Sequence, residues 1–378
     1  MVAVFEPSEY QARTSRAQEL MGQHGLVAML LTCEADVRYY TGYLTRFWES
    51  PSRPWFLVVP AIGKPVAVIP SIGAALMGQT WIDDIRTWAA PQPGDDGVSL
   101  LADTLRDLAP SGNIGLPYQL ESHLRMPLGD YAALQAALPD HSFGTDHGIT
   151  ADLRQVKSEA EIAKIATACT IAGKAFADVP TIATIGTPLS DVFRNFQRLC
   201  LQHGADWVPY LAGGADQAGY CDVISPASDA PLQEGDVLML DTGLIHDGYF
   251  CDYDRNFAVG RASAVVQQAQ HQLMEACAAG LEAAQPGATA ADVYHAMHAI
   301  VGGSDAGRLG HGLGMQLTEG LSLIAEDHTV LKAGMVITLE PSVATQNGRL
   351  IVHEENIVIR EGGAQILSPW SKPELEVI

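Results

Sequence analysis

A histidine set among glycines is the first feature of this sequence that could do chemistry. His311 lies in the segment Gly310-His311-Gly312-Leu313-Gly314. Glycine removes side-chain bulk, so the backbone can approach a ligand or a metal closely, and neutral imidazole is a common metal ligand. The segment is equally compatible with an ordinary turn, so other residues must decide between a turn and a metal site.

Two carboxylates follow apolar segments that are predicted to be strands. Residues 235–241 and 334–340 are both apolar runs, and each closes on an acidic residue, Asp241 and Glu340. A carboxylate at the end of a buried strand is costly unless it is paired or ligated. Either residue alone could turn into solvent, but two equivalent positions favour a shared site.

The first of these strands is followed by a turn and a returning segment that carries more acidic residues. After Asp241 the chain turns within residues 242–248 and returns through residues 249–257. A hairpin over this stretch would bring Asp252 or Asp254 back beside Asp241.

The second strand is followed by a similar return, which we predict as one strand over residues 350–359. Side chains alternate between the two faces of a strand. If Glu354 faces the site, His353 and Glu355 face outward. His353 is therefore interpreted as a surface neighbour of the site and not as a ligand.

Four carboxylates and one imidazole are thus expected to meet: Asp241, Asp252, His311, Glu340 and Glu354. Unpaired, such a cluster would repel itself by an energy on the order of several kcal/mol, whereas two divalent cations balance its charge. Oxygen-rich ligation with a single histidine suits Mn²⁺, Co²⁺, Fe²⁺ or Zn²⁺. Two such ions can hold a bridging hydroxide as nucleophile and polarise a carbonyl group, so amide hydrolysis is the expected chemistry.

The elements that carry these residues are predicted to be duplicated. Residues 186–192 and 287–293 share one helix-start pattern, and residues 235–241 and 334–340 share one strand pattern. The offsets between equivalent acidic positions, 292 − 191 = 101 and 340 − 241 = 99, nearly agree. Two units of about 100 residues at a fixed offset indicate an internal repeat.

An α/β domain is predicted for residues 1–150, because strands and helices alternate there. Its predicted elements are a helix over residues 8–23 with Ser8 as N-cap, a strand over 26–31, a hairpin of strands 55–59 and 66–69, and a helix over 100–108 before residues 114–117. A second domain is predicted for residues 151–378, which opens with Ser158 and Glu161 as a capping box.

Composition limits the class of protein. A chain of 378 residues with 47% hydrophobic content favours two globular domains, and a net charge of −22 argues against nucleic-acid binding. The six cysteines form no C-x-x-C pair and are interpreted as reduced, mostly buried thiols. No apolar stretch reaches the roughly 18 residues of a membrane span. We therefore expect a soluble, cytoplasmic protein with no membrane partner.

The complete pattern resembles the superfamily of methionine aminopeptidase, prolidase, aminopeptidase P and creatinase, which is called pita-bread or M24. The resemblance is carried by Asp241-x-Gly243, Asp252 eleven residues after Asp241, the segment 310–314, Thr338-Leu339-Glu340-Pro341 and Glu354-Glu355-Asn356. It covers residues 150–378, and the first 150 residues are similar to a creatinase-type N-terminal domain. It implies an α+β pita-bread catalytic domain with an internal pseudo-two-fold repeat.

The resemblance also implies roles for individual residues. Asp241 would chelate one metal ion, Asp252 and Glu354 would bridge two ions, and His311 and Glu340 would hold the second ion. Glu340 would shuttle the proton from the bridging water to the leaving amine, with Thr338 as its hydrogen-bonding partner.

The family further implies a homodimer in which the N-terminal domain of one subunit approaches the site of the other. Residues 43–53 are rich in aromatic and charged side chains, which favour contacts. They would be the segment that approaches the site of the other subunit. The alternative is a plain surface loop with a half-buried Trp48.

The sequence departs from the peptidases of this family at three places. A Pro-His segment is replaced by Val223-Ile224-Ser225-Pro226, a histidine seven residues after the metal-binding histidine is replaced by Thr318, and an arginine two residues before the last glutamate is replaced by Val352. The two histidines would stabilise the oxyanion of the scissile carbonyl, a contribution of roughly a few kcal/mol.

Three functions therefore stay open. The first is a dinuclear Xaa-Pro peptidase, either a dipeptidase or an aminopeptidase, and the second is a creatinase-, ectoine hydrolase- or dimethylsulfoniopropionate lyase-like enzyme with a small non-peptide substrate. The third is a non-catalytic binding protein, against which five costly buried polar groups argue. Candidate catalytic residues are Glu340, Thr338 and Thr318; candidate substrate-binding residues are Arg46, Trp48, Arg53, Tyr220 and Asp222.

Overall fold

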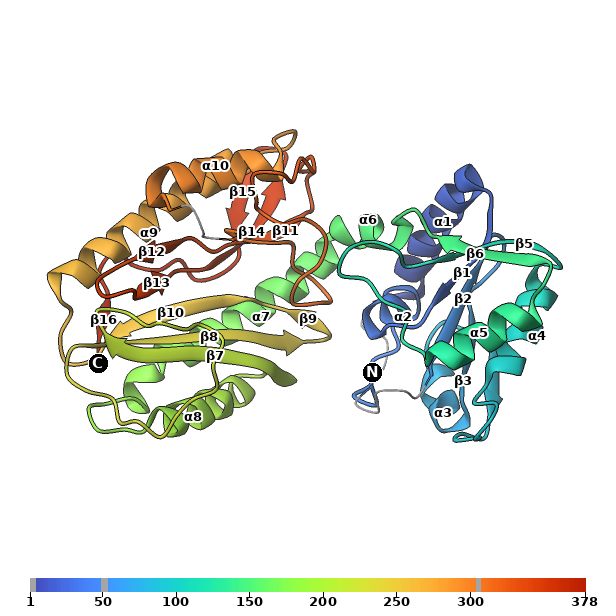
Figure 1. Ribbon diagram of the computed structural model, residues 1–378, viewed down its shortest axis with the longest axis horizontal. Coiled ribbons are helices and arrows are strands. Elements are labelled where there is room, and N and C mark those ends of the chain that lie inside the picture. The colour runs from blue at the N-terminus through green and yellow to red at the C-terminus, as the bar shows by residue number, and fades with distance from the viewer. Residues whose placement is uncertain (1–4, 49–53, 304–306) are drawn as a thin grey trace. The chain divides into compact units, whose positions relative to one another are not determined.

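The computed structural model describes residues 5–48, 54–303 and 307–378. The chain divides into two compact units, Met1–Arg154 and Gln155–Ile378, and Figure 1 shows both units as mixed α/β structures.

The first unit is built on a six-stranded mixed sheet with the strand order β4-β3-β2-β1-β5-β6. The strands are β1 (Leu26–Leu31), β2 (Phe56–Pro60), β3 (Val66–Pro70), β4 (Ile85–Trp88), β5 (Gly112–Leu116) and β6 (His141–Thr145). The helices are α1 (Pro7–His24), α2 (Glu34–Thr41), α3 (Ala74–Met77), α4 (Val98–Leu108), α5 (Leu128–Ala137) and α6 (Ile149–Gln155), the last of which crosses the boundary between the units.

The central strand β1 is apolar along its whole length because helices cover both of its faces. Ala28 and Leu30 pack with residues of α4 and α5 in one hydrophobic cluster, and α1 packs against the same strand. The alternation of β1 side chains between two buried faces follows from the two-residue period of a strand.

The predicted elements of this unit are confirmed, apart from one helix cap. The strand over 26–31 coincides with β1, the predicted hairpin is the antiparallel pair β2 and β3, and the helix over 100–108 lies within α4. Ser8 is not the N-cap: α1 begins at Pro7, after Glu6. Proline suits the first helical position because its fixed φ is helical and its missing N–H would be unpaired there.

The second unit contains two similar halves. The first half comprises α7 (Glu159–Ala177), α8 (Leu189–Gln202), β7 (Trp207–Gln217), β8 (Asp236–His246), β9 (Tyr249–Phe250) and β10 (Tyr253–Ala258). The second half comprises α9 (Ala264–Ala283), α10 (Ala290–Val301), β11 (Val336–Leu339), β12 (Ser342–Ala344), β13 (Leu350–Val352), β14 (Glu355–Arg360) and β15 (Gly363–Ile366). The final strand β16 (Glu376–Val377) joins the sheet of the first half beside β10.

Each half places a pair of helices beside its own sheet, as the predicted repeat requires (Figure 1). Helices α7 and α8 pack on the sheet β16-β10-β8-β7, and α9, with α10 packed against it, contacts the smaller sheet β11-β14-β15 and the pair β12-β13. The predicted capping box of Ser158 and Glu161 is present at the start of α7, and Thr289 and Asp292 form another at the start of α10.

The prediction that Asp241 ends its strand is wrong. Strand β8 continues past Asp241 to His246, and the chain turns at Asp247 and Gly248, whose φ values are 49° and 82°. The strand is longer because β7 and β9 both pair with its second part, for example through Ile245. These long-range pairings are not visible in the local sequence.

The prediction that residues 350–359 form one strand is also wrong. The segment is split into β13, which pairs with β12, and β14, which pairs with β11 and β15. The alternation therefore breaks where the chain passes from one sheet to the other. His353 and Glu355, predicted to face outward, are 1% and 0% exposed.

The cysteine prediction is confirmed. All six cysteines are free thiols, and five of them are buried, with Cys221 as the exposed one. In the described part of the chain, no helix has the length and apolar character that crossing a membrane requires.

Candidate metal centre

Five elements of the second unit converge on one cavity of about 550 Å³. Its lining includes all five residues that were predicted as metal ligands: Asp241, Asp252, His311, Glu340 and Glu354. Asp241 lies within β8 and Asp252 directly before β10, whereas Glu340 follows β11 and Glu354 directly precedes β14.

His311 reaches the cavity because its segment runs alongside β11. The Thr338 N–H donates to the His311 carbonyl at 2.8 Å, and the His311 N–H donates to the Thr338 hydroxyl at 2.9 Å. Glycine is needed on both sides of the histidine, at Gly310 for the approach to β11 and at Gly312 for the approach to the backbone at Glu319. A Cβ on Gly310, whose φ is 145°, would lie 2.2 Å from the Thr338 carbonyl oxygen, and one on Gly312 would lie 2.0 Å from that of Glu319.

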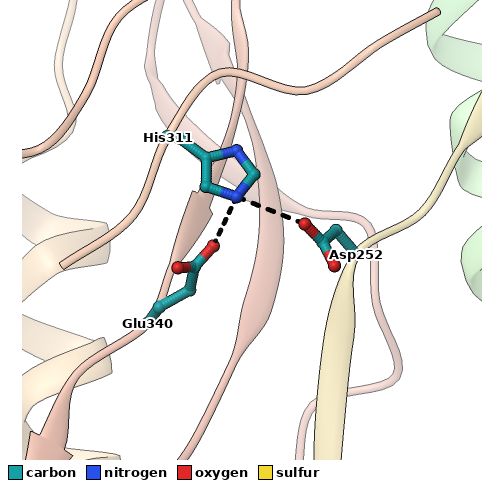
Figure 2. Close-up of side chains that lie close together, drawn as sticks. All are labelled: Asp252, His311 and Glu340. Carbon is teal, nitrogen blue, oxygen red and sulfur yellow. Dashed lines mark ion pairs between the residues drawn. The ribbon is translucent and has the colours of Figure 1, made fainter. Parts of the chain in front are cut away.

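The imidazole of His311 faces two carboxylates, as Figure 2 shows. Its Nε2 lies 2.9 Å from Glu340 Oε1 and 3.2 Å from Asp252 Oδ2. Its Nδ1 lies 2.9 Å from the Gly312 carbonyl oxygen, which holds a proton on Nδ1 and leaves Nε2 as the nitrogen that can bind a cation.

The five residues form two overlapping groups of possible ligands. Asp252, His311 and Glu340 form one group, and Asp241, Asp252 and Glu354 form the other, with the ligand atoms of each group within 4.8 Å of one another. Asp252 is common to both groups. Asp241, Asp252 and Glu354 are only 6%, 4% and 9% exposed, so water does little to separate their charges.

The donor set fits divalent metal ions. Asp241 Oδ1 is buried and has no hydrogen-bond partner among the described residues, and a buried unpartnered carboxylate oxygen costs about 1–3 kcal/mol or more. A cation bound at this oxygen would remove that cost and offset the repulsion between the acidic groups.

The pKa values of three acidic groups express the same electrostatic conflict. Burial, and then the charge of Asp252, raises the pKa of Asp241 well above its ordinary value. Burial, and then the charge of Asp241, raises the pKa of Glu354 in the same way. Burial raises the pKa of Asp252 to about 6, although the neighbouring His311 opposes this rise.

His311 and Glu340 stabilise each other's charged forms. Burial lowers the pKa of His311, but the Glu340 and Asp252 carboxylates outweigh this effect and raise that pKa to about 10. Burial raises the pKa of Glu340, but His311 outweighs it and the pKa is lowered. Bound divalent ions would take over this role, because a cation favours every carboxylate in its charged form.

The two predicted catalytic threonines have different surroundings. Thr338 is fully buried and its hydroxyl donates to Glu340 Oε1. Thr318 lines the cavity, and its hydroxyl accepts a hydrogen bond from Arg308 Nη2 at 3.1 Å.

Arg308 was missed in the sequence, although it lies only three residues before His311 on the same segment. Among the described residues that line the cavity, it is the only arginine or lysine. Tyr210, on β7, was also missed; burial, and then the charge of Asp241, raises the pKa of its hydroxyl. Its place opposite Gly243, two residues from Asp241, depends on the pairing of β7 with β8, which local sequence does not reveal.

Much of the remaining cavity wall is aliphatic and includes Val223, Ile224, Met239, Leu317, Leu350 and Val352. Val223 and Ile224 of the segment 223–226, together with Thr318 and Val352, therefore bring the departures from the family pattern to the wall of this same cavity.

Tyr220 and Asp222, predicted to bind substrate, are not among the residues that line this cavity. Tyr220 is 2% exposed, and its hydroxyl accepts from the Val352 N–H at 2.7 Å. Asp222 is exposed and caps a turn through the Ile224 and Ser225 N–H groups. Hydrogen bonds within the fold thus account for both polar groups.

The other predicted substrate residues belong to the first unit. Arg46 is exposed. Trp48 is half-buried, its ring centroid lies 5.8 Å from that of Trp55, and the guanidinium of Arg125 lies over the Trp48 ring. Arg53 lies outside the described residues.

Asp252 and Asp254, the two alternatives left open by the sequence, have different surroundings. Asp254 is the residue that pairs with Asp241 in the β8–β10 ladder. Its carboxylate is fully buried and accepts from the Glu354 N–H at 2.7 Å, whereas Asp252 belongs to both groups of possible metal ligands.

Comparison with known proteins places this site in a family. Residues 163–361, more than half of the chain, match metallopeptidase family M24, and residues 13–156 match the creatinase/prolidase N-terminal domain. A protein of Mycobacterium bovis named probable dipeptidase PepE is 27% identical over 379 aligned positions, which cover 95% of this chain and 94% of that protein.

Solved structures show the same fold. The dipeptidase PepE from Mycobacterium ulcerans has a TM-score of 0.83 at 28% identity and covers 99% of both chains. The Xaa-Pro dipeptidase from Bacillus anthracis has a TM-score of 0.84 at 20% identity over 98% of this chain and 100% of its own. These similarities confirm the predicted pita-bread architecture with a creatinase-type N-terminal domain, and the chain belongs to metallopeptidase family M24, a family of metallohydrolases.

Proposed function

We propose that this protein is a cytoplasmic dipeptidase that uses two divalent metal ions to cleave dipeptides, with Xaa-Pro dipeptides as the first candidates. The observation that carries the proposal is the overlap of two buried ligand groups in one cavity, with Asp252 common to both. The similarity to proteins named dipeptidase PepE and Xaa-Pro dipeptidase supports the substrate class.

The ligand groups support a division of roles. Asp241 would bind one ion, His311 and Glu340 would bind the other, and Asp252 and Glu354 would bridge them; the membership of Asp252 in both groups supports its bridging position. Manganese is our first choice of metal because carboxylate ligands suit it. Cobalt, zinc and iron are alternatives, because a carboxylate-rich site with one histidine also accepts them.

Divalent ions in this site would supply an activated water and a Lewis acid for the scissile carbonyl. Glu340 would receive the proton of that water and pass it to the leaving amine. The Thr338 hydroxyl donates to Glu340 Oε1, and this contact would orient the carboxylate for the transfer.

The cavity wall suits a small peptide with an apolar residue and a free carboxylate. Its volume of about 550 Å³ is within the usual range of small-molecule sites, and its aliphatic wall could pack against a proline ring. Arg308 is proposed to bind the C-terminal carboxylate of the dipeptide, with Thr318 orienting the guanidinium through their 3.1 Å hydrogen bond.

A small non-peptide amide is the second candidate substrate. It is favoured by the cavity wall itself, where Val352 and Thr318 stand in place of the arginine and histidine expected from the family resemblance. Such a wall offers fewer polar contacts to a peptide backbone.

The experiment begins with metal analysis of protein loaded with Mn²⁺, Co²⁺ or Zn²⁺. It continues with turnover of Ala-Pro, Gly-Pro, Ala-Ala and a tripeptide against osmolyte-like amides. We expect two ions per chain and cleavage of dipeptides. Absence of bound metal would refute the dinuclear site, and turnover of the amides alone would establish the second candidate.

We also propose that the protein is a homodimer in which residues 43–53 contribute to substrate selection. The aromatic and charged character of this segment supports the idea. Sedimentation of the purified protein tests the dimer. Substitution of Trp48 is expected to change substrate preference while metal content stays the same, and unchanged kinetics would count against this role.

A further inference from the structure

We infer that Asp254 and Asn356 are positioning residues that hold the backbones of the two metal-bridging carboxylates in register by reciprocal hydrogen bonds. The inference rests on the proposed dinuclear site, because it concerns how Asp252 and Glu354 are kept at bridging positions.

The two bridging carboxylates come from different sheets. Asp252 directly precedes β10, which belongs to the sheet β16-β10-β8-β7, and Glu354 directly precedes β14, which belongs to the sheet β11-β14-β15. Within the described residues, no ladder pairs β10 with β14. The relative position of the two residues therefore depends on side chains that cross between the sheets.

Among the side chains that cross, Asp254 and Asn356 each accept the N–H of a bridging residue, and Arg255 of β10 also donates to the Glu354 carbonyl oxygen at 2.9 Å. Asp254 Oδ1, from β10, accepts the Glu354 N–H at 2.7 Å. Asn356 Oδ1, from β14, accepts the Asp252 N–H at 3.0 Å, and its Nδ2 donates to the Asp252 carbonyl oxygen. Each bridging carboxylate is thus held through its backbone by a side chain from the other sheet.

The arrangement follows the internal repeat. Each positioning residue lies two residues after the bridging ligand of its own strand, at 254 − 252 = 2 and 356 − 354 = 2. The ligands and the positioning residues share one offset, 354 − 252 = 102 and 356 − 254 = 102. A reciprocal contact of this kind is expected where two related strands meet across a pseudo-two-fold axis.

The residue types match what each position must do. Asn356 satisfies both an N–H and a carbonyl oxygen, which requires a donor and an acceptor on one side chain, as an amide provides. Asp254 needs only acceptors: one oxygen takes the Glu354 N–H, and the other takes Asn256 Nδ2 at 3.1 Å. Both residues are 0% exposed, so water does not replace a lost contact.

Deleting either side chain should therefore displace a bridging carboxylate and weaken metal binding. Partners that orient metal ligands typically change metal affinity by about 10–100-fold when they are removed. The polar groups of Asp252 and Glu354 would also lose buried hydrogen bonds, so the variants are expected to be less stable as well as weaker in metal binding.

The test uses the full chain and measures metal binding directly. Asn356→Ala and Asp254→Ala are compared with wild type by calorimetric titration of Mn²⁺ and by the visible absorption spectrum of the Co²⁺-loaded protein. We expect Kd to rise about 10–100-fold for at least one ion and the Co²⁺ spectrum to change. Wild-type affinities and spectra in both variants would overturn the inference.

Conservative variants separate positioning from general stability. Asp254→Asn keeps an oxygen that can accept the Glu354 N–H but loses the acceptor for Asn256 Nδ2. Asn356→Asp keeps the acceptor but loses the donor. Both variants fill the space that alanine would leave empty, so both should fold even if the alanine variants do not. We expect Asp254→Asn to restore most of the metal affinity and Asn356→Asp to lose part of it. If Asp254→Asn binds metal as poorly as Asp254→Ala, the positioning role of this side chain is refuted.

Gln270→Leu is the matched control. Gln270 is 2% exposed in the same unit, and no hydrogen bond among the described residues connects it with a metal ligand. This variant tests whether the loss of any buried polar side chain of the unit changes the Co²⁺ spectrum. We expect an unchanged spectrum, and a change equal to that of the alanine variants would overturn the inference. A wild-type protein that binds two ions but cleaves no dipeptide would refute the proposed function and leave this inference standing. A wild-type protein that binds no ion would refute both.

Discussion

Replacing Arg308 by methionine should separate substrates by their charge. Arg308 lines the cavity with its guanidinium 3.1 Å from the Thr318 hydroxyl. Methionine keeps an unbranched side chain that can fill much of the same space, but it removes the charge and the donors. If Arg308 binds the C-terminal carboxylate, the loss applies only to substrates that carry this carboxylate.

The size of the effect follows from the kind of contact. A hydrogen bond to a charged group contributes about 1.5–3 kcal/mol, and each 1.4 kcal/mol corresponds to about a tenfold change in affinity. We therefore expect kcat/KM for Ala-Pro to fall by about 10–100-fold in Arg308→Met, mainly through KM. For Ala-Pro amide, which lacks the carboxylate, the change should stay within a factor of about three.

The assay compares the two substrates on metal-loaded protein, with metal content measured for each variant. Metal content matters because the Arg308 charge also lowers the pKa of Asp252 and Glu340, against the larger effect of burial on each. Thr318→Val keeps the Arg308 charge and should cause a smaller loss. Arg194→Met, at an exposed position of α8, is the control for the removal of a cation elsewhere.

The proposed contact would be refuted if Arg308→Met lowered kcat/KM equally for the free and the amidated substrate. An equal loss with reduced metal content would assign Arg308 to the electrostatics of the metal site. An unchanged kcat/KM for both substrates would show that the dipeptide carboxylate binds elsewhere.

The metal site and its histidine segment give three further predictions. His311→Ala should remove at least one of two bound ions and abolish turnover, as metal analysis and kinetics would show; two retained ions would contradict its role as a ligand. The metal-free protein should lose stability as the pH rises from about 6.5 to 10. The His311 pKa is raised to about 10 in the folded state, so the stabilising proton is lost in that window. Thermal melting with and without chelator measures this loss, and the trend should vanish in His311→Ala. Gly312→Ala should lower the melting temperature by the equivalent of about 1–3 kcal/mol, since its Cβ would lie 2.0 Å from the Glu319 carbonyl oxygen; a melting temperature equal to that of wild type would show that the segment relaxes freely.

The five proposed ligands could be named from the sequence because these residues combine chemistry with position. Asp241 and Glu340 stand at equivalent places in a repeat, and His311 stands between glycines that allow close approach. None of these inferences required knowledge of which strands pair. The convergence of these residues in one cavity follows from the fold, whereas their side-chain types are given directly by the sequence.

The errors arose where distant pairing decides local structure. Asp241 lies inside β8 because β7 and β9 extend that strand, and His353 is buried because the chain changes sheets beside it. Asn356 was quoted as part of a motif, but its contact with Asp252 depends on two strands of different sheets. Arg308 is different: its position three residues before His311 was visible, and its charge could have been weighed.

The internal repeat preserves the scaffold of the site and diverges in its chemistry. Gly213 and Gly310 have φ values of 148° and 145°. A Cβ on Gly213 would lie 2.1 Å from the Met239 carbonyl oxygen, and one on Gly310 would lie 2.2 Å from that of Thr338. Met239 and Thr338 stand two positions before Asp241 and Glu340. Both halves thus bring a glycine backbone against the strand that carries a proposed ligand. The next residue is His311 in the second half and Gly214 in the first. Since the close approach is common to both halves, it is a property of the duplicated fold. The imidazole is present in the second half and not at the corresponding place in the first, and it makes one side of the proposed metal pair chemically distinct from the other.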